Sequence, residues 1–461
     1  MTEPASPEPV PAPPKGRRLA WLDAMRGFAA LCVVFDHMGG LVLQRPHDLV
    51  YRVLDTGQYG VFVFFLVSGY IIPASLERKG SVRGFWVSRV FRLYPLYIVA
   101  IALSLLAFKT GFGALHGAEH APKTWIYSVP FMMSNMLDGT NVPNVIWTLS
   151  FEMVFYLLLT ALFTFRAHRP SGAYALTAAG AALAVGGLLP NSALNHLHVL
   201  GHWTGDRRIA ILAGAGILIG LALAVTGRAR LRAVGVIMAA GTGLVLLLFN
   251  TSYPGPCTGL VILALMFTGT MLYRAEQGQL AWKHALTIAA GVFVLAAAAG
   301  LWHGPGGWTP GNMTQYRIQW MACLVLAGAT FALGMAVRHK KVPGWLAWLG
   351  LVSYSVYLLH PIILNAYRSI DAFRQPHPFP IQVLLAAGIL AVVLICSAAT
   401  YYLVESPMQK WGHRTSRFLQ ARFGPDTIPA GPVVTAPDAP AVPAEMPPEP
   451  APQAARRVAG R

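Results

Sequence analysis

The chain has 461 residues, of which 55% are hydrophobic and only 11% are charged. Soluble globular proteins carry about 25% charged residues, so this composition excludes a soluble protein and predicts an integral membrane protein. The formal net charge of +17 does not indicate a nucleic-acid partner, because the basic residues form short clusters between apolar runs. The four cysteines lie singly in apolar runs and predict neither a disulfide framework nor a metal site.

Twelve apolar runs, most of them close to the length of a spanning helix, follow one another along the chain. They lie near residues 21–43, 59–76, 93–108, 144–165, 173–189, 209–226, 231–249, 257–273, 284–302, 317–337, 345–367 and 381–403. The fifth, eighth and ninth runs are the least regular, because they are short and rich in small residues. We therefore expect an all-α polytopic protein whose ten to twelve spans enclose a buried polar site.

The two ends of the chain differ from this middle part in composition. Residues 1–18 and 412–461 are rich in Pro and Ala, so we expect a disordered and a mostly disordered tail around a membrane domain at 19–411. Lys and Arg gather in alternate loops, whereas loops 250–256 and 303–316 contain neither. Because Lys and Arg accumulate in cytoplasmic loops, twelve spans with both termini in the cytoplasm agree with this pattern, and so do ten.

The first run carries two ionisable side chains, Arg26 and His37. Eleven residues at about 100° each return to nearly the same helix face, roughly 16 Å further along the axis. Ionisable residues are costly in lipid, so we expect this face to point into the bundle. The alternative is that Arg26 extends to the interface while His37 is a hydrogen-bonded core residue.

Arg89 and Arg92 lie three residues apart near the start of the third run, so they share a helix face at the expected cytoplasmic mouth. Two guanidinium groups there suit phosphate oxygens. The alternative is that both arginines only set the topology of the chain.

Two later runs carry further polar groups. Glu152 lies in the fourth run at about the depth of His37, so a contact between them is sterically plausible, and Tyr156 follows one turn further in. The alternative for Glu152 is a protonated structural role. Ser353, Tyr357 and His360 form a polar stripe on one face of the eleventh run, although a His before a Pro can also simply kink a helix.

The order of these motifs resembles the membrane-bound acyltransferase 3 family over most of residues 18–410. The family's R-x10-H pattern is matched by Arg26 and His37, and its Arg-rich segment by Arg89 and Arg92. Its WxLxxE helix is matched by Trp147, Leu149 and Glu152, and its SYxxYLxH-like helix by Ser353, Tyr354, Tyr357 and His360. The family is usually assigned ten spans.

The resemblance implies a bacterial plasma-membrane enzyme that moves an acyl group, acetyl or another short one, from acyl-CoA to a carbohydrate or glycoside hydroxyl. His37 is then the expected general base, with Glu152 orienting it. Arg26, Arg89, Arg92, Tyr156, Ser353, Tyr357 and His360 are the expected substrate-binding residues. We expect no bound cofactor, with acyl-CoA as co-substrate. The acyl length, the acceptor, the side on which it binds and the oligomeric state, including a homo-oligomer, stay open.

A proton-coupled secondary transporter is the alternative, in which His37, Glu152 and His360 relay protons. A purely structural membrane protein is a third class. The sequence contains no Walker P-loop, no GxSxG elbow and no HExxH motif, so ATP-driven transport and serine or zinc hydrolysis lack their usual signatures.

Overall fold

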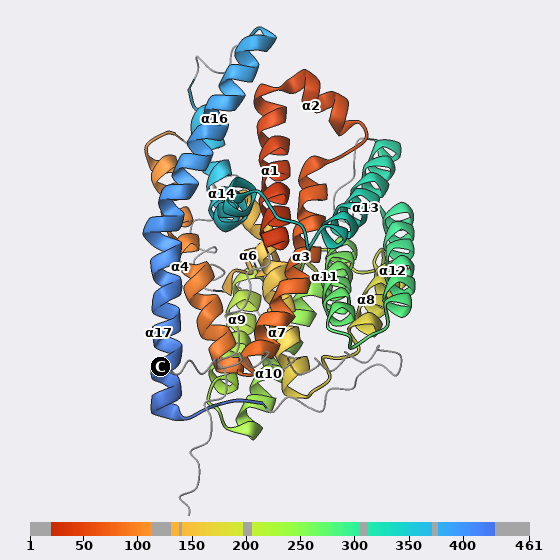
Figure 1. The fold of residues 1–461 in the computed structure, drawn as a ribbon, viewed down its shortest axis with the longest axis vertical. Coiled ribbons are helices and arrows are strands. Elements are labelled where there is room, and N and C mark those ends of the chain that lie inside the picture. The colour runs from red at the N-terminus through yellow and green to blue at the C-terminus, as the bar shows by residue number, and fades with distance from the viewer. Residues whose placement is uncertain are drawn as a thin grey trace, which may run out of the picture.

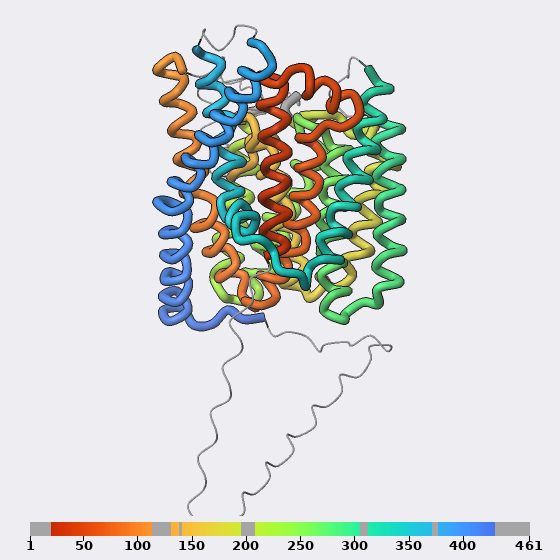
Figure 2. Tube along the Cα trace, turned by 45° about the horizontal axis from the view of Figure 1, so that its top comes forward, coloured from red at the N-terminus to blue at the C-terminus, as the bar shows by residue number. Residues whose placement is uncertain are grey.

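The structure is a computed structural model, and it describes residues 20–112, 131–137, 141–196, 205–304, 312–370 and 377–428. Those residues form a bundle of helices that run side by side (Figure 1, Figure 2). In that part of the chain the β pairing amounts to one isolated antiparallel bridge, between Ser81 and Thr427. The prediction of an all-α polytopic membrane protein is confirmed.

The longer helices are α1 (Ala20–Val42), α3 (Thr56–Lys79), α4 (Val82–Lys109), α7 (Trp147–Thr164), α8 (Ser171–Val185), α9 (Gly205–Ala224), α10 (Ala229–Phe249), α11 (Pro256–Glu276), α12 (Trp282–His303), α13 (Met313–Ala336), α14 (Gly344–Arg368), α16 (Phe379–Thr400) and α17 (Ser406–Phe423). Short elements are α2 (Gln44–Tyr51), α6 (Ser134–Leu137), the 3-10 turns η2 (Asn144–Ile146) and η3 (Ala193–His196), and the π-helical turn η4 (Tyr401–Glu405).

Within the described residues, ten helices are long and apolar enough to cross a membrane. The last of them is continuous from Phe379 through η4 to Phe423. The fifth apolar run forms the shorter helix α8, of 15 residues, and the sixth run forms α9, of 20 residues. The eighth and ninth runs, expected to be among the least regular, form the full-length helices α11 and α12.

The two ends of the bundle differ in charge. We call the end with the α3–α4 and α9–α10 connections the arginine end, because Arg78, Arg83 and Arg228 lie there. The opposite end carries α2, which lies across the top of the bundle in Figure 1. The arginine end is the one that the loop charges predict to face the cytoplasm.

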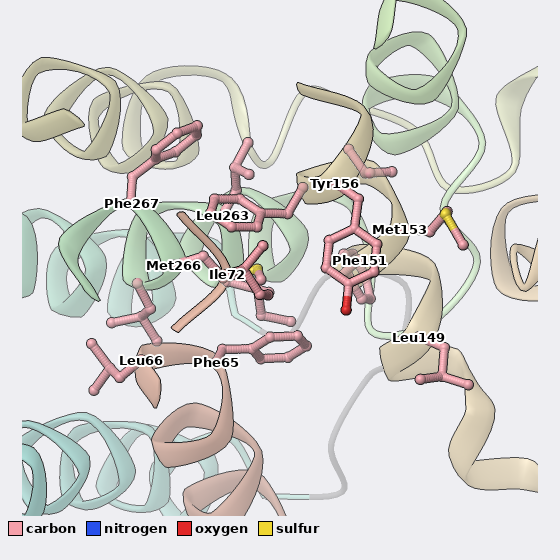
Figure 3. Packing of buried hydrophobic residues seen from close by; sticks show 14 of the residues in the cluster. Phe65, Leu66, Ile72, Leu149, Phe151, Met153, Tyr156, Leu263, Met266 and Phe267 are labelled. Carbon is pink, nitrogen blue, oxygen red and sulfur yellow. The ribbon is translucent and has the colours of Figure 1, made fainter. Parts of the chain in front are cut away.

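Helices α3 and α11 form the centre of the bundle, and most of their residues are buried. A Cβ atom at Gly69 of α3 would overlap the carbonyl of Met266, and one at Gly269 of α11 would overlap the carbonyl of Leu66. Small residues let two helices approach this closely in a membrane. Figure 3 shows the packing around this contact, where Phe65 and Leu66 lie near Met266.

The chain after α17 folds back onto the start of α4. We call residues 424–428 the C-terminal strap. The carboxylate of Asp426 accepts hydrogen bonds from the hydroxyl of Ser81 and, at 2.8 Å, from the backbone N–H of Arg83. The N–H of Ile428 donates to the carbonyl of Gly80 at 2.7 Å. In the expected mostly disordered tail from residue 412, α17 continues to Phe423 and the strap follows it. The rest of that tail and the expected disordered tail at 1–18 lie outside the described residues.

Candidate functional site

The site is built on a close crossing of α1 and α14, which run in the same direction from the arginine end. A Cβ at Gly350 would overlap the backbone of α1, and one at Gly27 would lie 2.8 Å from the backbone nitrogen of Gly350. His37 and His360 each lie ten residues beyond these glycines along parallel helices. The glycine crossing therefore brings the two imidazoles to the same level near the opposite end.

His37 and His360 are joined by a hydrogen bond of 2.9 Å between Nδ1 of His37 and Nε2 of His360. Nδ1 of the fully buried His360 lies 3.0 Å from the carbonyl oxygen of Val356. Because a carbonyl only accepts, the neutral His360 carries its proton on Nδ1 and accepts at Nε2. The neutral His37 then donates from Nδ1, which leaves the lone pair on its Nε2.

A cavity of about 140 Å³ lies at the opposite end, and His37 is part of its lining. We call it the acceptor-side cavity, after the role proposed for it below. Its wall includes the polar residues Asp36, Asp55 and Gln319 and the aromatic residues Trp147, Tyr253 and Tyr357. Sequence reasoning missed both aspartates, although Asp36 is adjacent to His37 and Asp55 stands at the N-cap of α3.

The two aspartates of this cavity lie close together, and both carboxylates are near Gly57. Asp36 accepts from the hydroxyl of Thr56 at 3.2 Å and lies 3.6 Å from Nε2 of His47. Asp55 accepts from the N–H of Gln58 at 2.7 Å. Burial, followed by the negative charge of Asp36, raises the pKa of the Asp55 carboxyl to about 6.

A second cavity, of about 480 Å³, lies at the arginine end. We call it the donor-side cavity, likewise after its proposed role. Three arginines, Arg26, Arg78 and Arg92, line it together with the carboxylates of Asp23 and Glu405. Arg78 belongs to a basic loop cluster and is not among the substrate-binding residues expected from the sequence. Guanidinium groups from three helices or helix ends can bind a polyanion there through paired N–H groups.

An aromatic pair lies between the two cavities. The guanidinium carbon of Arg26 lies 5.5 Å from the centroid of the Phe64 ring. Phe64 stacks on Tyr357, with ring centroids 6.3 Å apart. Since Arg26 lines the donor-side cavity and Tyr357 the acceptor-side cavity, Phe64 stands between them.

Glu152 does not contact His37, contrary to the expected pairing. Its carboxylate accepts a hydrogen bond from the hydroxyl of Tyr156, one turn further along α7. The Tyr156 ring in turn lies 5.1 Å from the guanidinium carbon of Arg89. The two side chains point in different directions from their helices. His37 faces α14, where it contacts His360, whereas Glu152 faces α4.

Arg89 and Arg92 do not form a common phosphate clamp. Arg89 is buried between the rings of Phe85 and Tyr156, at 4.9 and 5.1 Å from their centroids, and does not line the donor-side cavity. Arg92 does line that cavity. The three-residue spacing places both arginines on one broad face of α4, but the Tyr156 ring of α7 packs against Arg89 and separates it from Arg92.

The stripe expected on α14 is also divided. Ser353 is buried, and its hydroxyl donates to the carbonyl of Gly350 in its own helix at 2.9 Å. The hydroxyl of Tyr357 lies 3.0 Å from the carbonyl of Val145 and 2.9 Å from the hydroxyl of Thr148. Ser353 is therefore placed for helix packing, Tyr357 for the cavity wall and His360 for contact with His37.

The fold and its buried polar groups define a polytopic membrane protein with a polar site between two cavities. The family model of the acyltransferase 3 domain, described as an acyltransferase domain, matches residues 19–401 of the chain. The chain belongs to this acyltransferase family, and the family resemblance is confirmed. Over the described residues no group of three or more His, Cys, Asp or Glu side chains is arranged to hold a metal ion.

Individual bacterial relatives match only part of the chain. Acyltransferase MdmB of Streptomyces mycarofaciens is 31% identical over 157 residues, which cover 32% of this chain and 39% of that protein. Nodulation protein 10 of Rhizobium leguminosarum bv. viciae is 33% identical over 158 residues, covering 30% of this chain and 43% of its own. O-acetyltransferase OatA of Staphylococcus aureus is 28% identical over 167 residues, with 33% of this chain and 26% of that protein covered. The matches therefore span less than half of each relative, and no solved structure matches.

Proposed function

We propose that the protein is a bacterial plasma-membrane O-acyltransferase, with acyl-CoA as donor and a carbohydrate or glycoside hydroxyl as acceptor. The observation that carries this proposal is the geometry of His37. Its Nδ1 is held by His360 at 2.9 Å, which leaves the lone pair on Nε2, and the residue lines a cavity. An imidazole fixed in this way suits a general base.

The chemistry follows from that proton arrangement. Nε2 of His37 takes the proton of the acceptor hydroxyl while the oxygen attacks the thioester carbonyl carbon. The carbon–sulfur bond then breaks, an ester remains, and the CoA sulfur leaves with the proton from His37. His360 holds the imidazole by accepting from Nδ1, so we propose it as a positioning residue in place of Glu152.

The donor would enter from the arginine end. Arg26, Arg78 and Arg92 line a cavity that can take the phosphates of CoA. Arg26 and His37 are separated by eleven residues of α1, roughly 16 Å along the axis, a span that an extended pantetheine arm can bridge. Phe64 and Tyr357 stand along that path.

The membrane orientation follows from the loop charges. Because Lys and Arg favour cytoplasmic loops, the arginine end would face the cytoplasm, where acyl-CoA is made, and both termini would lie there. The acceptor would reach His37 from the other side, through the acceptor-side cavity. The relative OatA, an O-acetyltransferase by name, supports acetyl or another short acyl as the transferred group.

The test uses the full chain in lipid nanodiscs with acetyl-CoA and a panel of glycosides. We expect thiol release that depends on an acceptor and a mass increase of that acceptor by one acyl group. His37→Ala should lower kcat by about 10² to 10⁴ without weakening donor binding. Proton uptake into proteoliposomes without thioester loss would instead identify a transporter.

The donor cavity is tested separately. Arg26→Ala and Arg92→Ala should each raise KM for acetyl-CoA by roughly tenfold, because each removes a charge-assisted phosphate contact. Arg414→Ala is the matched control, since Arg414 is exposed on α17 and does not line the cavity. An unchanged donor KM in both cavity variants would limit these arginines to topology.

A further inference from the structure

The acceptor-side cavity has an excess of negative charge. Asp36 and Asp55 both line it, and the described residues of its wall include no Lys or Arg. Two imidazoles lie near them: His37 in the cavity wall, which the hydrogen bond to His360 holds as a neutral ring, and His47, whose Nε2 lies 3.6 Å from a carboxylate oxygen of Asp36. One imidazole can compensate at most one of the two carboxylates. At neutral pH at least one negative charge therefore stays without a cationic partner at this wall.

Aromatic rings complete the same wall. Trp147 and Tyr253 meet edge to face with ring centroids 5.3 Å apart, and Tyr51 lies in the wall beside the aspartates. Tyr316 is only 6% exposed and lines the cavity, yet its hydroxyl has no hydrogen-bond partner among the described residues. Aromatic faces beside carboxylates are the surroundings that organic ammonium ions prefer.

We propose that the acceptor carries an organic ammonium group close to the hydroxyl that is acylated, and that Asp36, Asp55 and the rings of Trp147 and Tyr253 bind this group. The unsatisfied hydroxyl of Tyr316 supplies a further polar contact for the ligand. An acceptor bound this way places a neighbouring hydroxyl toward His37, which shares the cavity wall. The acylation of this ligand rests on the proposed function, whereas its binding does not.

The experiment measures binding without any donor. Choline and 3,3-dimethyl-1-butanol have nearly the same shape and differ in charge, and both are small enough for a cavity of about 140 Å³. In calorimetric titrations of the full chain in nanodiscs, choline should bind at least about tenfold more tightly than 3,3-dimethyl-1-butanol. A desolvated cation between aromatic rings and carboxylates gains binding free energy of that size.

The variants locate the site. Asp36→Asn and Asp55→Asn should remove most of the preference for choline. Asn also serves as a helix N-cap, so Asp55→Asn should preserve the start of α3. Asp48→Asn is the matched control, because that side chain is 70% exposed and lies outside the cavity wall. It should keep the wild-type preference within a factor of about two.

Three results would overturn the inference: equal binding of the two probes, a preference unchanged in both cavity variants, or choline binding weaker than about 10 mM. Since no thioester is present, none of these results depends on catalysis. A separate comparison of methyl glucosaminide with its N-acetylated form as acyl acceptors should favour the amine. Failure of both acceptors with intact choline binding would contradict the proposed transfer and not the cation site.

Discussion

At the scale of single residues, the site depends on which nitrogen of His37 carries the proton. His360 fixes that choice, because its own Nδ1 is occupied by the carbonyl of Val356 and its Nε2 can only accept when the ring is neutral. A base held in one tautomer needs no reorientation before it takes a proton. The contact between the two imidazoles should therefore be visible in kinetics.

We expect His360→Leu to lower kcat by about 10 to 10² while leaving the donor KM nearly unchanged, because the base stays present but is no longer held. His360→Gln should recover part of the loss, since the amide oxygen can accept from Nδ1 of His37. The pH profile of kcat should shift in His360→Leu. Equal rates in the Leu and Gln variants, with an unshifted profile, would leave His360 with a packing role only.

A second residue-scale prediction concerns Asp55, whose pKa is raised to about 6 by burial and then by Asp36. The carboxyl takes up a proton as the pH falls through this value, so the cavity loses negative charge. Choline affinity should drop by about threefold to tenfold between pH 7.5 and pH 5. Affinity that rises on acidification would contradict the assignment.

The titratable groups that face Asp55 set the controls for this measurement. They are Asp36, His47, Tyr51, Tyr253 and Cys323. Of these, His47 is the imidazole in contact with the pair, 3.6 Å from a carboxylate oxygen of Asp36, so a variant without this imidazole is the control for Asp55. The pH dependence should flatten in Asp55→Asn and persist in His47→Gln.

Several site residues were predicted from the sequence, but their partners were not. Helical periodicity indicates which face of α7 Glu152 occupies. It does not give the rotation of α7 relative to α1, which tertiary packing decides. His360 was identified only as part of a stripe on α14, and its contact with His37 depends on two glycines in different helices.

At the scale of helices, the crossing of α1 and α14 should be sensitive to one methyl group. A Cβ at Gly350 would overlap the carbonyl of Asp23, so Gly350→Ala must push the two helices apart. We expect a loss of stability of about 1–3 kcal/mol, as for other overpacked sites. We also expect a fall in kcat, because the imidazoles ten residues further on would separate.

Thermal unfolding and single-turnover rates on the same sample measure both effects. Gly388→Ala in α16 is the matched control, because nothing lies within 4 Å of a Cβ built there, and Ala is the better helix former. Its stability and turnover should match wild type or slightly exceed it. A Gly350→Ala protein with wild-type turnover would show that the glycine crossing does not set the contact between His37 and His360.

Helix number was predicted well and helix length less well. Long apolar runs with few charges determine a span almost by themselves, since the alternative is charged or unpaired polar groups in lipid. The fifth run forms the short helix α8, which has 15 residues and packs against α11 and α12. Composition could not separate it from a full span, because helices buried within a bundle and helices facing lipid are equally apolar.

At the scale of the whole molecule, the C-terminal strap joins the end of the described chain to the start of α4. Asp426 and Arg83 are both almost fully buried, with 3.7 Å between a carboxylate oxygen and a guanidinium nitrogen. Arg232 on α10 adds a hydrogen bond of 3.4 Å to the carbonyl of Asp426. The Pro-rich composition of residues after 424 hid this element, because its contacts are made by individual polar atoms rather than by a periodic apolar face.

We expect Asp426→Ala to destabilise the protein by about 3 kcal/mol or more, since it removes the counter-charge of a buried guanidinium and leaves the backbone N–H of Arg83 and the hydroxyl of Ser81 without their acceptor. The donor KM should rise as well, because α4 also carries Arg92. Asp48→Ala is the control for loss of an exposed aspartate. Unfolding in detergent and donor titration on both variants measure the two effects, and wild-type stability in Asp426→Ala would make the strap an incidental contact.

The strap also imposes an order on biosynthesis. Ser81 and Arg83 are translated early, whereas their acceptor, Asp426, is added only after every spanning helix has been made. Nascent chains fold from the N-terminus as they emerge, so a bundle stalled before residue 426 would hold Arg83 unpaired at its arginine end. The start of α4 would then lack its contacts with the strap until Asp426 has been added.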